Sequence, residues 1–427
     1  MKRFCLSIAI IVLLAIPSLS MPEYLEVTAP GNRTLQLAIA SPVPLGDIKS
    51  SAVAMEMAEL FRFDLTLAGP FTVQPLPKAE GTGSIKPGSF DLAPWKAAGA
   101  DLLVKTGYFI SGNTLVLECR LFDVAREAEL SAKRYTGDYK DLRRMAHSFS
   151  DEIMRAITGD KGPFSGKIAY VSTQTGNKEI YLMDYDGFNV QRVTGNRSIN
   201  LNPDFSPSGR EITFTSYKGG NPDLYRRELF TGSEARVSAS RGLNIGGAWA
   251  PDGNRIALTM SKDGHAQIYV ITKDGKNTTR LTNGRAMDVS PAWSPDGSNI
   301  AFVSDRLGKP QVFIMGVDGS NVHRLTTSGS YNVSPRWSPK GDRIVYCRQQ
   351  GGGFQIYSIN PDGSSDTCLT NEGNNEHPRW SPDGRFIAFS SKRDGREAIY
   401  VMRADGTGQT RVSRDKGENS HPVWTSW

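Results

Sequence analysis

The second half of the chain repeats a pattern of short apolar segments separated by polar turns. An aromatic residue recurs at intervals of 44, 44, 44, 43 and 44 residues, in the order Phe205, Trp249, Trp293, Trp337, Trp380 and Trp424. The first five open a turn of the Trp-Ser-Pro-Asp-Gly type, in which Pro presets φ and Gly accepts a positive φ. An Ile-Ala-Phe segment, an Ile-Tyr segment, an Asp-Gly turn and an Arg-Leu-Thr segment follow. Each unit therefore predicts four short strands.

Six such units predict a closed ring of strands. Four short strands in about 40–45 residues are typical of one propeller blade, so residues 165–427 are predicted to form a six-bladed β-propeller. The segment that begins at Ile168 matches a second strand with no first strand before it, whereas residues 421–427 match a first strand with nothing after it. We therefore expect the C-terminal segment to complete the blade that begins at Ile168, which leaves no exposed edge in the ring.

Residues 21–160 lack the repeat and predict a different domain. Residues 35–39, 102–104 and 115–121 match strands, and residues 47–67 predict a helix rich in Ala and Met. A second helix is predicted around 142–157, where apolar residues fall at helical spacing before a C-cap at Gly159. The fold class is therefore α+β multi-domain: an N-terminal α/β domain at 21–160, a joint at Gly162-Pro163, and the propeller at 165–427.

The first 20 residues match a secretory signal peptide. Lys2 and Arg3 precede an apolar run of 13 residues (4–16), which is followed by Pro17 and a small-residue pattern at 18–20. A run of 13 residues is too short to cross a bilayer, which takes about 20. We expect residues 1–20 to be removed and the remainder to be exported; a retained membrane anchor is the alternative.

Composition narrows the class of protein further. Hydrophobic residues make up 38% and charged residues 22% of the 427, which excludes a polytopic membrane protein and a disordered chain. Glycine is abundant, at 43 residues, because the repeated turns require it. The net charge of +6 is too small to predict a nucleic-acid surface. Beyond the signal, Cys119, Cys347 and Cys368 form an odd set, which we expect to be free, buried thiols.

The sequence contains few signs of catalysis. There is no Gly-x-Ser-x-Gly elbow, P-loop, His-Glu-x-x-His or Cys-x-x-Cys motif, and of the five histidines only His377 and His421 share a repeat position. We therefore predict a non-enzymatic protein with no catalytic residue and no metal-ligand set. The alternative is a periplasmic carbohydrate-active enzyme that uses the propeller channel, because such a site is assembled from several blades and leaves no local motif.

Polar residues recur just before each aromatic residue. An Asn or Asp lies five residues before it in all six units: Asn200, Asn244, Asp288, Asn332, Asn375 and Asn419. Because the first strand of a blade is innermost, these side chains are expected to ring the mouth of the channel, with His377 and His421 facing the same funnel. They predict a polar rim for a docked peptide. The alternatives are Asx turns onto their own backbone, hydrogen-bonded turn histidines, or a Ca²⁺ site with only one carboxylate in six.

The start of the exported chain is a second candidate contact. Glu23, Tyr24, Leu25, Glu26 and Val27 alternate polar and apolar side chains. A free strand of this kind can add to the sheet edge of a partner. The alternative is an ordinary edge strand of its own domain.

The motifs in both halves resemble the TolB family. The blade pattern Pro-x-Trp-Ser-Pro-Asp-Gly, Ile-Ala-Phe, Ile-Tyr, Asp-Gly, Arg-Leu-Thr is similar to the propeller of that family, although other propellers share it. The N-terminal half adds, in the family's order, Trp-Lys-Ala-Ala-Gly-Ala-Asp at 95–101, Leu-Phe-Asp at 121–123, Leu-Arg-Arg-Met-Ala-His at 142–147, Asp-Glu-Ile at 151–153 and Thr-Gly-x-x-Gly-x-Phe at 158–164. Blade two departs from the pattern with Gly246-Gly247, and with residues 230–232 in place of the Asp-Gly turn; blade one departs at Asn202 and Phe205.

This resemblance implies a function in the Tol-Pal system. The family is periplasmic and non-enzymatic, supports outer-membrane integrity and constriction at cell division, and links inner-membrane TolA to the outer-membrane lipoprotein Pal. It implies that Pal docks in the funnel, that residues 23–27 bind TolA, and that bacteriocins can exploit the same surfaces. It further implies a monomer that associates with membranes only through its partners.

Overall fold

The computed structural model describes residues 34–74 and 84–425, which belong to one compact unit. The predicted signal peptide at 1–20 and the candidate segment from Glu23 to Val27 lie outside the described residues. Within the described ranges, no helix is both long enough and apolar enough to cross a membrane.

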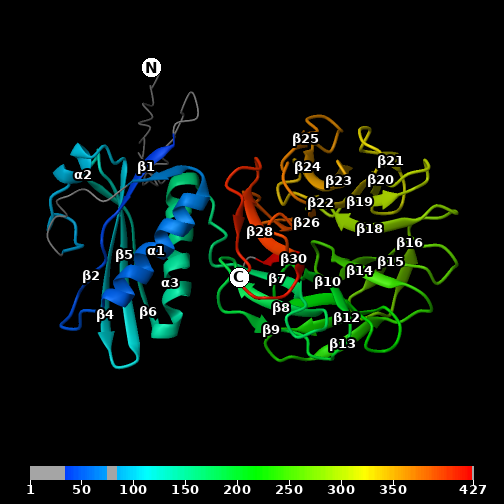
Figure 1. The fold of residues 1–427 in the computed structure, drawn as a ribbon, viewed down its shortest axis with the longest axis horizontal. Coiled ribbons are helices and arrows are strands. Elements are labelled where there is room, and N and C mark those ends of the chain that lie inside the picture. Colours follow the sequence, from blue (N-terminus) through cyan, green and yellow to red (C-terminus); the bar gives the residue numbers. More distant parts are fainter. Residues whose placement is uncertain (1–33, 75–83, 426–427) are drawn as a thin grey trace, which may run out of the picture. The chain divides into compact units, whose positions relative to one another are not determined.

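A mixed sheet forms the centre of the N-terminal domain (Figure 1). Its strands run in the order β3-β1-β4-β5-β6, and β2 pairs with β4. The bounds are β1 Leu35–Ile39, β2 Val43–Pro44, β3 Phe71–Val73, β4 Leu102–Ser111, β5 Thr114–Asp123 and β6 Ala128–Asp138. The strands predicted at 35–39, 102–104 and 115–121 are therefore present. The sequence pattern missed β6, because most of its side chains are exposed and its apolar alternation is weak.

Two helices cover one face of this sheet (Figure 1). The helices of the domain are α1 Ser51–Ala68, α2 Ala93–Ala97, the 3₁₀ turn η1 Tyr139–Asp141, and α3 Leu142–Thr158. The Ser50 side chain caps the start of α1 by accepting a hydrogen bond from the Val53 N–H, and Gly159 ends α3 with φ 83° as predicted. The buried faces of α1 and α3 meet where Phe61 and Phe149 pack edge to face, with ring centroids 6.0 Å apart.

Six four-stranded antiparallel sheets form the propeller, as predicted. From the innermost strand outward, blade one is β10 Asn200–Phe205, β11 Glu211–Ser216, β12 Asp223–Glu228 and β13 Glu234–Ser238, and blade two is β14 Asn244–Trp249, β15 Arg255–Met260, β16 Gln267–Thr272 and β17 Thr278–Arg280. Blade three is β18 Asp288–Trp293, β19 Asn299–Ser304, β20 Gln311–Gly316 and β21 His323–Arg324, and blade four is β22 Asn332–Trp337, β23 Ile344–Gln350, β24 Gly353–Ile359 and β25 Thr367–Cys368. Blade five is β26 Asn375–Trp380, β27 Phe386–Ser391, β28 Ala398–Arg403 and β29 Thr410–Arg411.

The sixth blade joins the two ends of the propeller segment. Its strands are β30 Asn419–Thr425, β7 Lys167–Ser172, β8 Glu179–Asp184 and β9 Gln191–Arg192. The C-terminal strand β30 pairs antiparallel with β7, with Val423 opposite Ala169 and Trp424 opposite Ile168. The predicted closure of the ring by the C-terminal segment is therefore confirmed.

The Asp-Gly turns pack closely against the backbone of the neighbouring blade. The turn after β8 places Gly187 at φ 89°, and a Cβ added there would lie 1.8 Å from the carbonyl oxygen of Val412. Gly275, at the equivalent turn of another blade, would place a Cβ 2.5 Å from the carbonyl oxygen of Val237. These positions thus require glycine both for the left-handed backbone and for the close approach of the next blade.

A substitution at Gly187 tests this contact between blades. Gly187→Ala is expected to lower the free energy of unfolding by about 3 kcal/mol or more, because a left-handed alanine is strained and its Cβ overlaps a backbone oxygen that cannot easily move. Gly176→Ala is the matched control: φ is 88°, but no atom of the described residues lies within 4 Å of the added Cβ. Urea unfolding of both variants is the measurement. Equal losses at the two positions would show that backbone strain alone, and not the contact with Val412, sets the cost.

The N-terminal domain and the propeller share one apolar core. Residues of α1, α3 and the sheet cluster with Phe164, Tyr185 and Trp424, and the rings of Tyr185 and Trp424 stack with centroids 5.9 Å apart. The Arg403 guanidinium, at the end of β28, donates hydrogen bonds to the carbonyl oxygens of Thr66 and Leu67 at 2.8 and 3.0 Å. A cation at the C-terminal end of α1 is favourable because the unpaired carbonyl groups there carry partial negative charge.

A buried network of charged side chains also joins the N-terminal domain to the propeller. The His147 Nδ1 on α3 lies 2.9 Å from an Asp64 carboxylate oxygen on α1, and its Nε2 lies 3.1 Å from an Asp186 oxygen in the turn after β8. Arg143 also pairs with Asp186, and the Tyr185 hydroxyl donates to Asp64. Burial by itself lowers the pKa of His147, but the two carboxylates outweigh it and raise that pKa to about 10. His147 is therefore a doubly protonated cation held between two anions.

The three cysteines beyond residue 20 are free, as expected, but not all are buried. Cys119 and Cys347 are buried, and burial raises the pKa of both thiols. Cys368 is exposed, so its predicted burial is wrong. It lies on β25, the edge strand of its sheet, and both residues of this strand are exposed.

Candidate functional site: the central channel

The innermost strands of the six blades line the centre of the propeller. Each contacts the innermost strand of the next blade all the way round the ring. Each also carries a β-bulge at the same place, where the pairing with the second strand shifts register, for example between Leu201 and Asp204 and between Ser420 and Val423. A bulge re-aims the side chains on either side of it, so this repeated irregularity decides which residues face the channel.

One residue in every bulge has a left-handed backbone. Its φ lies between 51° and 67° in all six blades, and the residue is partly exposed; the six residues, called the channel rim below, are Asn202, Gly246, Ser290, Ser334, His377 and His421. Proline follows in five blades, at a position where the bulge removes the need for a ladder N–H. The Gly246-Gly247 departure of blade two therefore preserves the same backbone, because glycine adopts a positive φ freely.

The two rim histidines lie against each other. The rings of His377 and His421, on neighbouring blades, stack with centroids 3.6 Å apart. His377 Nδ1 is 3.2 Å from the Ser390 hydroxyl, and His421 Nδ1 is 3.0 Å from the Ser420 hydroxyl. Burial and the charge of Lys178 lower the pKa of His377 to about 4, and burial together with His377 lowers the pKa of His421. Both rings are neutral at pH 7 and present a flat, polar surface; the sequence predicted only that the two side chains face the same funnel.

The predicted ring of Asn and Asp side chains has a different position. Its members are buried, with none of their surface exposed: Asn200, Asn244, Asp288, Asn332, Asn375 and Asn419. Asn244 Nδ2 donates to the Ser240 carbonyl at 2.7 Å, Asn332 Nδ2 donates to the Ser328 carbonyl at 2.8 Å, and Asp288 pairs with Arg306 at 3.1 Å. Their predicted exposure at the rim is therefore wrong. Asn244, Asn332 and Asn375 brace the loops that enter their innermost strands by donating to earlier carbonyl groups, which are not Asx turns. The Asn419 side chain has no hydrogen-bond partner among the described residues. Direct contact of these residues with a partner stays a prediction.

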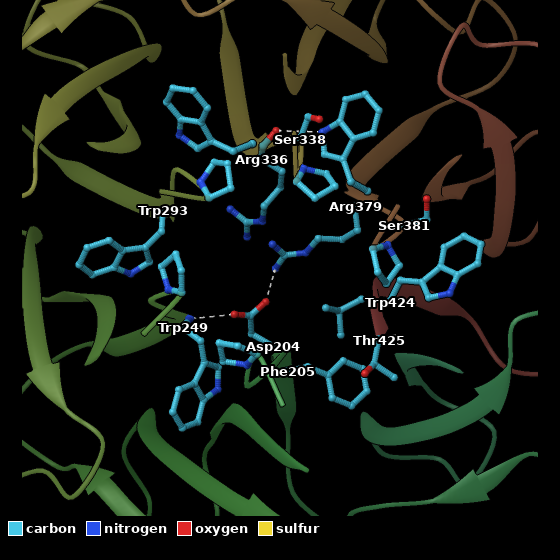
Figure 2. A pocket seen from close by; sticks show the side chains of 18 of the residues that line it. Asp204, Phe205, Trp249, Trp293, Arg336, Ser338, Arg379, Ser381, Trp424 and Thr425 are labelled. Atoms are coloured by element: carbon cyan, nitrogen blue, oxygen red, sulfur yellow. Dashed lines mark hydrogen bonds and ion pairs between the residues drawn. The ribbon is translucent and has the colours of Figure 1, made fainter. Parts of the chain in front are cut away.

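The opposite ends of the innermost strands surround an open cavity of about 310 Å³ (Figure 2). This cavity, called the channel base, lies among the aromatic residues and the Ser-Pro turns that follow them, and Arg336, Arg379 and Asp204 extend into it. Arg379 and Asp204 form an ion pair with nitrogen and oxygen 3.7 Å apart, and the backbone N–H of Trp249 donates to Asp204 at 2.9 Å. Burial raises the pKa of Asp204, while Arg379 and the Trp249 N–H oppose that rise.

Sequence reasoning missed these three charged residues. They occupy the variable position of Pro-x-Trp, where other blades have Ala248, Ala292 or Val423. The available signal was the charge of these three residues at a repeat position where the other blades have a small apolar residue. The spacing alone could not show that the three side chains meet, because they come from blades one, four and five.

The fold and the channel define a six-bladed propeller protein with an N-terminal α/β domain. Residues 154–427 match the family described as the TolB beta propeller domain, and residues 23–130 match the TolB amino-terminal domain. The chain therefore belongs to the TolB family.

Named relatives agree with this assignment. The chain is 63% identical over 211 residues to the Tol-Pal system protein TolB of Geobacter sulfurreducens, and 64% identical over 212 residues to that of Geobacter metallireducens. Each match covers 49% of this chain and 49% of the relative, so the chain spans about half the length of the curated relatives it matches. The crystal structure of TolB from Acinetobacter baumannii is 26% identical, with a TM-score of 0.80 over 92% of this chain and 96% of that one.

Proposed function

We propose that the chain is a periplasmic, non-enzymatic binding protein of a Tol-Pal system. In this proposal it links inner-membrane TolA to the outer-membrane lipoprotein Pal, and so supports outer-membrane integrity and constriction at cell division. Membership of the TolB family and the names of the relatives support the system. The relatives do not favour the carbohydrate-active enzyme alternative. We propose further that binding requires no cofactor.

The channel rim is the observation that carries the proposal. It offers six positions of the same backbone geometry, with amide, hydroxyl and imidazole groups that are partly exposed. Neutral imidazoles lose less hydration free energy on binding than charged ones, and the stacked pair of His377 and His421 is a flat surface on which a partner's side chain can rest. Such a ring suits a docked protein segment, and we assign Pal, or a bacteriocin that imitates it, to this rim.

The second partner is assigned to the start of the exported chain. Residues Glu23 to Val27 alternate polar and apolar side chains, which suits addition to the sheet edge of TolA. The two assignments involve different parts of the chain, so they can be tested separately.

Replacement of both rim histidines tests the assignment of Pal. His377→Gly with His421→Gly is expected to weaken Pal binding at least tenfold, about 1.4 kcal/mol, because the stacked surface disappears while glycine keeps the left-handed backbone already seen at Gly246. Calorimetric titration of the exported chain with Pal from the same organism is the measurement. The TolA affinity should not change.

Two further variants make this experiment specific. His323→Ala changes an exposed histidine on the outermost strand β21 and should leave both affinities unchanged. A chain that lacks residues 21–27 should lose TolA and keep Pal. Undiminished Pal binding by the double rim variant would count against the rim, and retained TolA binding by the shortened chain would count against the segment.

A further inference from the structure

The channel base holds more positive charge than its neighbours neutralise. Arg336 and Arg379 both extend into it, and Asp204 is the only carboxylate among the residues that line the described cavity. The acids in the adjoining turns have their own partners: Asp252 pairs with Arg255, Asp383 pairs with Arg385, and the Asp296 carboxylate accepts from Ser294 and Ser298.

Arg336 has hydrogen-bonding capacity to spare. Its Nη1 donates to the Pro335 carbonyl at 2.7 Å, while its buried Nε has no hydrogen-bond partner among the described residues. A guanidinium carries five N–H donors, so most of the donors of Arg336 are available. The pair between Arg379 and Asp204, at 3.7 Å, is also longer than a charge-assisted hydrogen bond of about 2.7–2.9 Å.

Unpaired cationic charge in a confined cavity is unfavourable, and an anion would relieve it. Burial lowers the pKa of Arg379 despite the attraction of Asp204, which reflects the cost of holding that charge away from bulk water. The same two guanidinium groups make the channel base a poor place for the Ca²⁺ ion considered from the sequence, because like charges repel.

We propose that the channel base is a second binding site, which takes a carboxylate-bearing ligand on Arg336 and Arg379. A planar carboxylate matches the fork of a guanidinium in both geometry and charge. The surrounding tryptophan and proline side chains suit an aliphatic stem, and a cavity of about 310 Å³ admits a group of several carbon atoms beside the carboxylate. The ligand is thus an organic acid or the acidic side chain of a peptide. This inference does not rest on the proposed partners of the rim.

Titration of the full exported chain with glutarate, at constant ionic strength, tests the site. Saturable binding is expected. Arg336→Met, which keeps the aliphatic stem and removes the charge, should weaken it at least tenfold, whereas Arg236→Met, at an exposed arginine, should not change it. Asp204→Asn should strengthen binding threefold or more, because it removes the carboxylate that competes for Arg379. A merely structural role for Asp204 would not produce a gain.

Two additional probes identify the source of the carboxylate. Tighter binding of an amidated peptide that ends in glutamate would identify a protein ligand, and tighter binding of glutarate would identify a free acid; either supports the site. Tighter binding of inorganic phosphate than of glutarate would overturn the carboxylate assignment. The absence of saturable binding by the unmodified chain, or the same dissociation constant in Arg336→Met, would overturn the site itself. Circular dichroism melting of each variant separates these outcomes from loss of the fold.

Discussion

A chain that stops at Glu418 is expected to lose its cooperative unfolding transition. The deletion removes β30, the innermost strand of the sixth blade, together with the buried side chains of Val423 and Trp424. Removal of one large buried aromatic side chain costs about 3–5 kcal/mol, and here a strand ladder is lost as well. The total is of the same order as the whole stability of a typical domain, about 5–15 kcal/mol. The deletion also exposes the edge of β7, which invites association with other chains.

Adding the missing C-terminal segment as a separate peptide gives a stricter test of this prediction. A synthetic peptide of residues 415–427, added to the shortened chain, should restore the transition by pairing with β7. The same peptide with Trp424→Asp should fail, because a carboxylate would then replace an indole that is buried against Tyr185 and Phe386. Circular dichroism melts with increasing peptide concentration are the measurement. A shortened chain that melts at the temperature of the full chain, without peptide, would show that the ring does not depend on its C-terminal strand.

The second large effect is expected at the buried histidine between the two domains. His147→Ala should lower the free energy of unfolding by about 3–5 kcal/mol, because it leaves the carboxylates of Asp64 and Asp186 buried without their shared cation. Arg143 continues to pair with Asp186, so Asp64 carries most of the penalty. His323→Ala, on an exposed strand, is the control and should change stability by less than about 0.5 kcal/mol.

The same network predicts a pH dependence with a defined sign. The folded pKa of His147 is about 10, above its unfolded value of 6.5, so its contribution to stability is complete below pH 6.5 and is lost as pH rises through 10. The folded pKa of Asp186 is lowered to about 2, because His147 and Arg143 outweigh the effect of burial, from an unfolded 3.8. Its contribution is complete above pH 3.8 and is lost as pH falls through 2.

Urea unfolding between pH 6.5 and 10 measures the first of these contributions. In this window the unmodified chain should lose up to about 1.4 kcal/mol per pH unit more than His147→Ala does. Parallel stability curves for the two chains would contradict the assignment of a cationic histidine. The histidine pair of the channel rim has lowered pKa values, so its effect on stability is complete by about pH 7.5; it is also the same in both chains and cancels from their comparison.

Most of the fold could be predicted because it depends on sequence patterns within short segments of the chain. The Trp-Ser-Pro-Asp-Gly and Asp-Gly turns have a backbone mechanism that does not depend on distant residues, and a 44-residue period with four strand-like segments has few structural solutions. The phase of that period even indicated that β30 pairs with β7. Strand β6 was missed because strand prediction relies on the alternation of apolar and polar residues. An exposed edge strand does not need that alternation.

The candidate site was predicted only in part. A shared repeat position indicated that His377 and His421 face the same funnel. The structure adds that their rings stack, because equivalent positions of adjacent blades are neighbours in a ring. The same reasoning failed for the Asn and Asp ring. Repetition shows that six residues occupy equivalent positions but not which way their side chains face. The bulge in each innermost strand turns the residue two positions further along the chain, and not the Asn or Asp, toward the channel.

The sequence by itself determined the number of blades, the closure of the ring, the glycine turns and the resemblance to the TolB family, because each depends on residues close together in the chain or on their period. Only the tertiary structure decided which polar groups are exposed, that His147 lies between two carboxylates, and that Arg336, Arg379 and Asp204 share one cavity. Those features join residues tens to more than a hundred positions apart. Their charges and pKa values depend on burial and distance, which no periodic pattern along a chain contains.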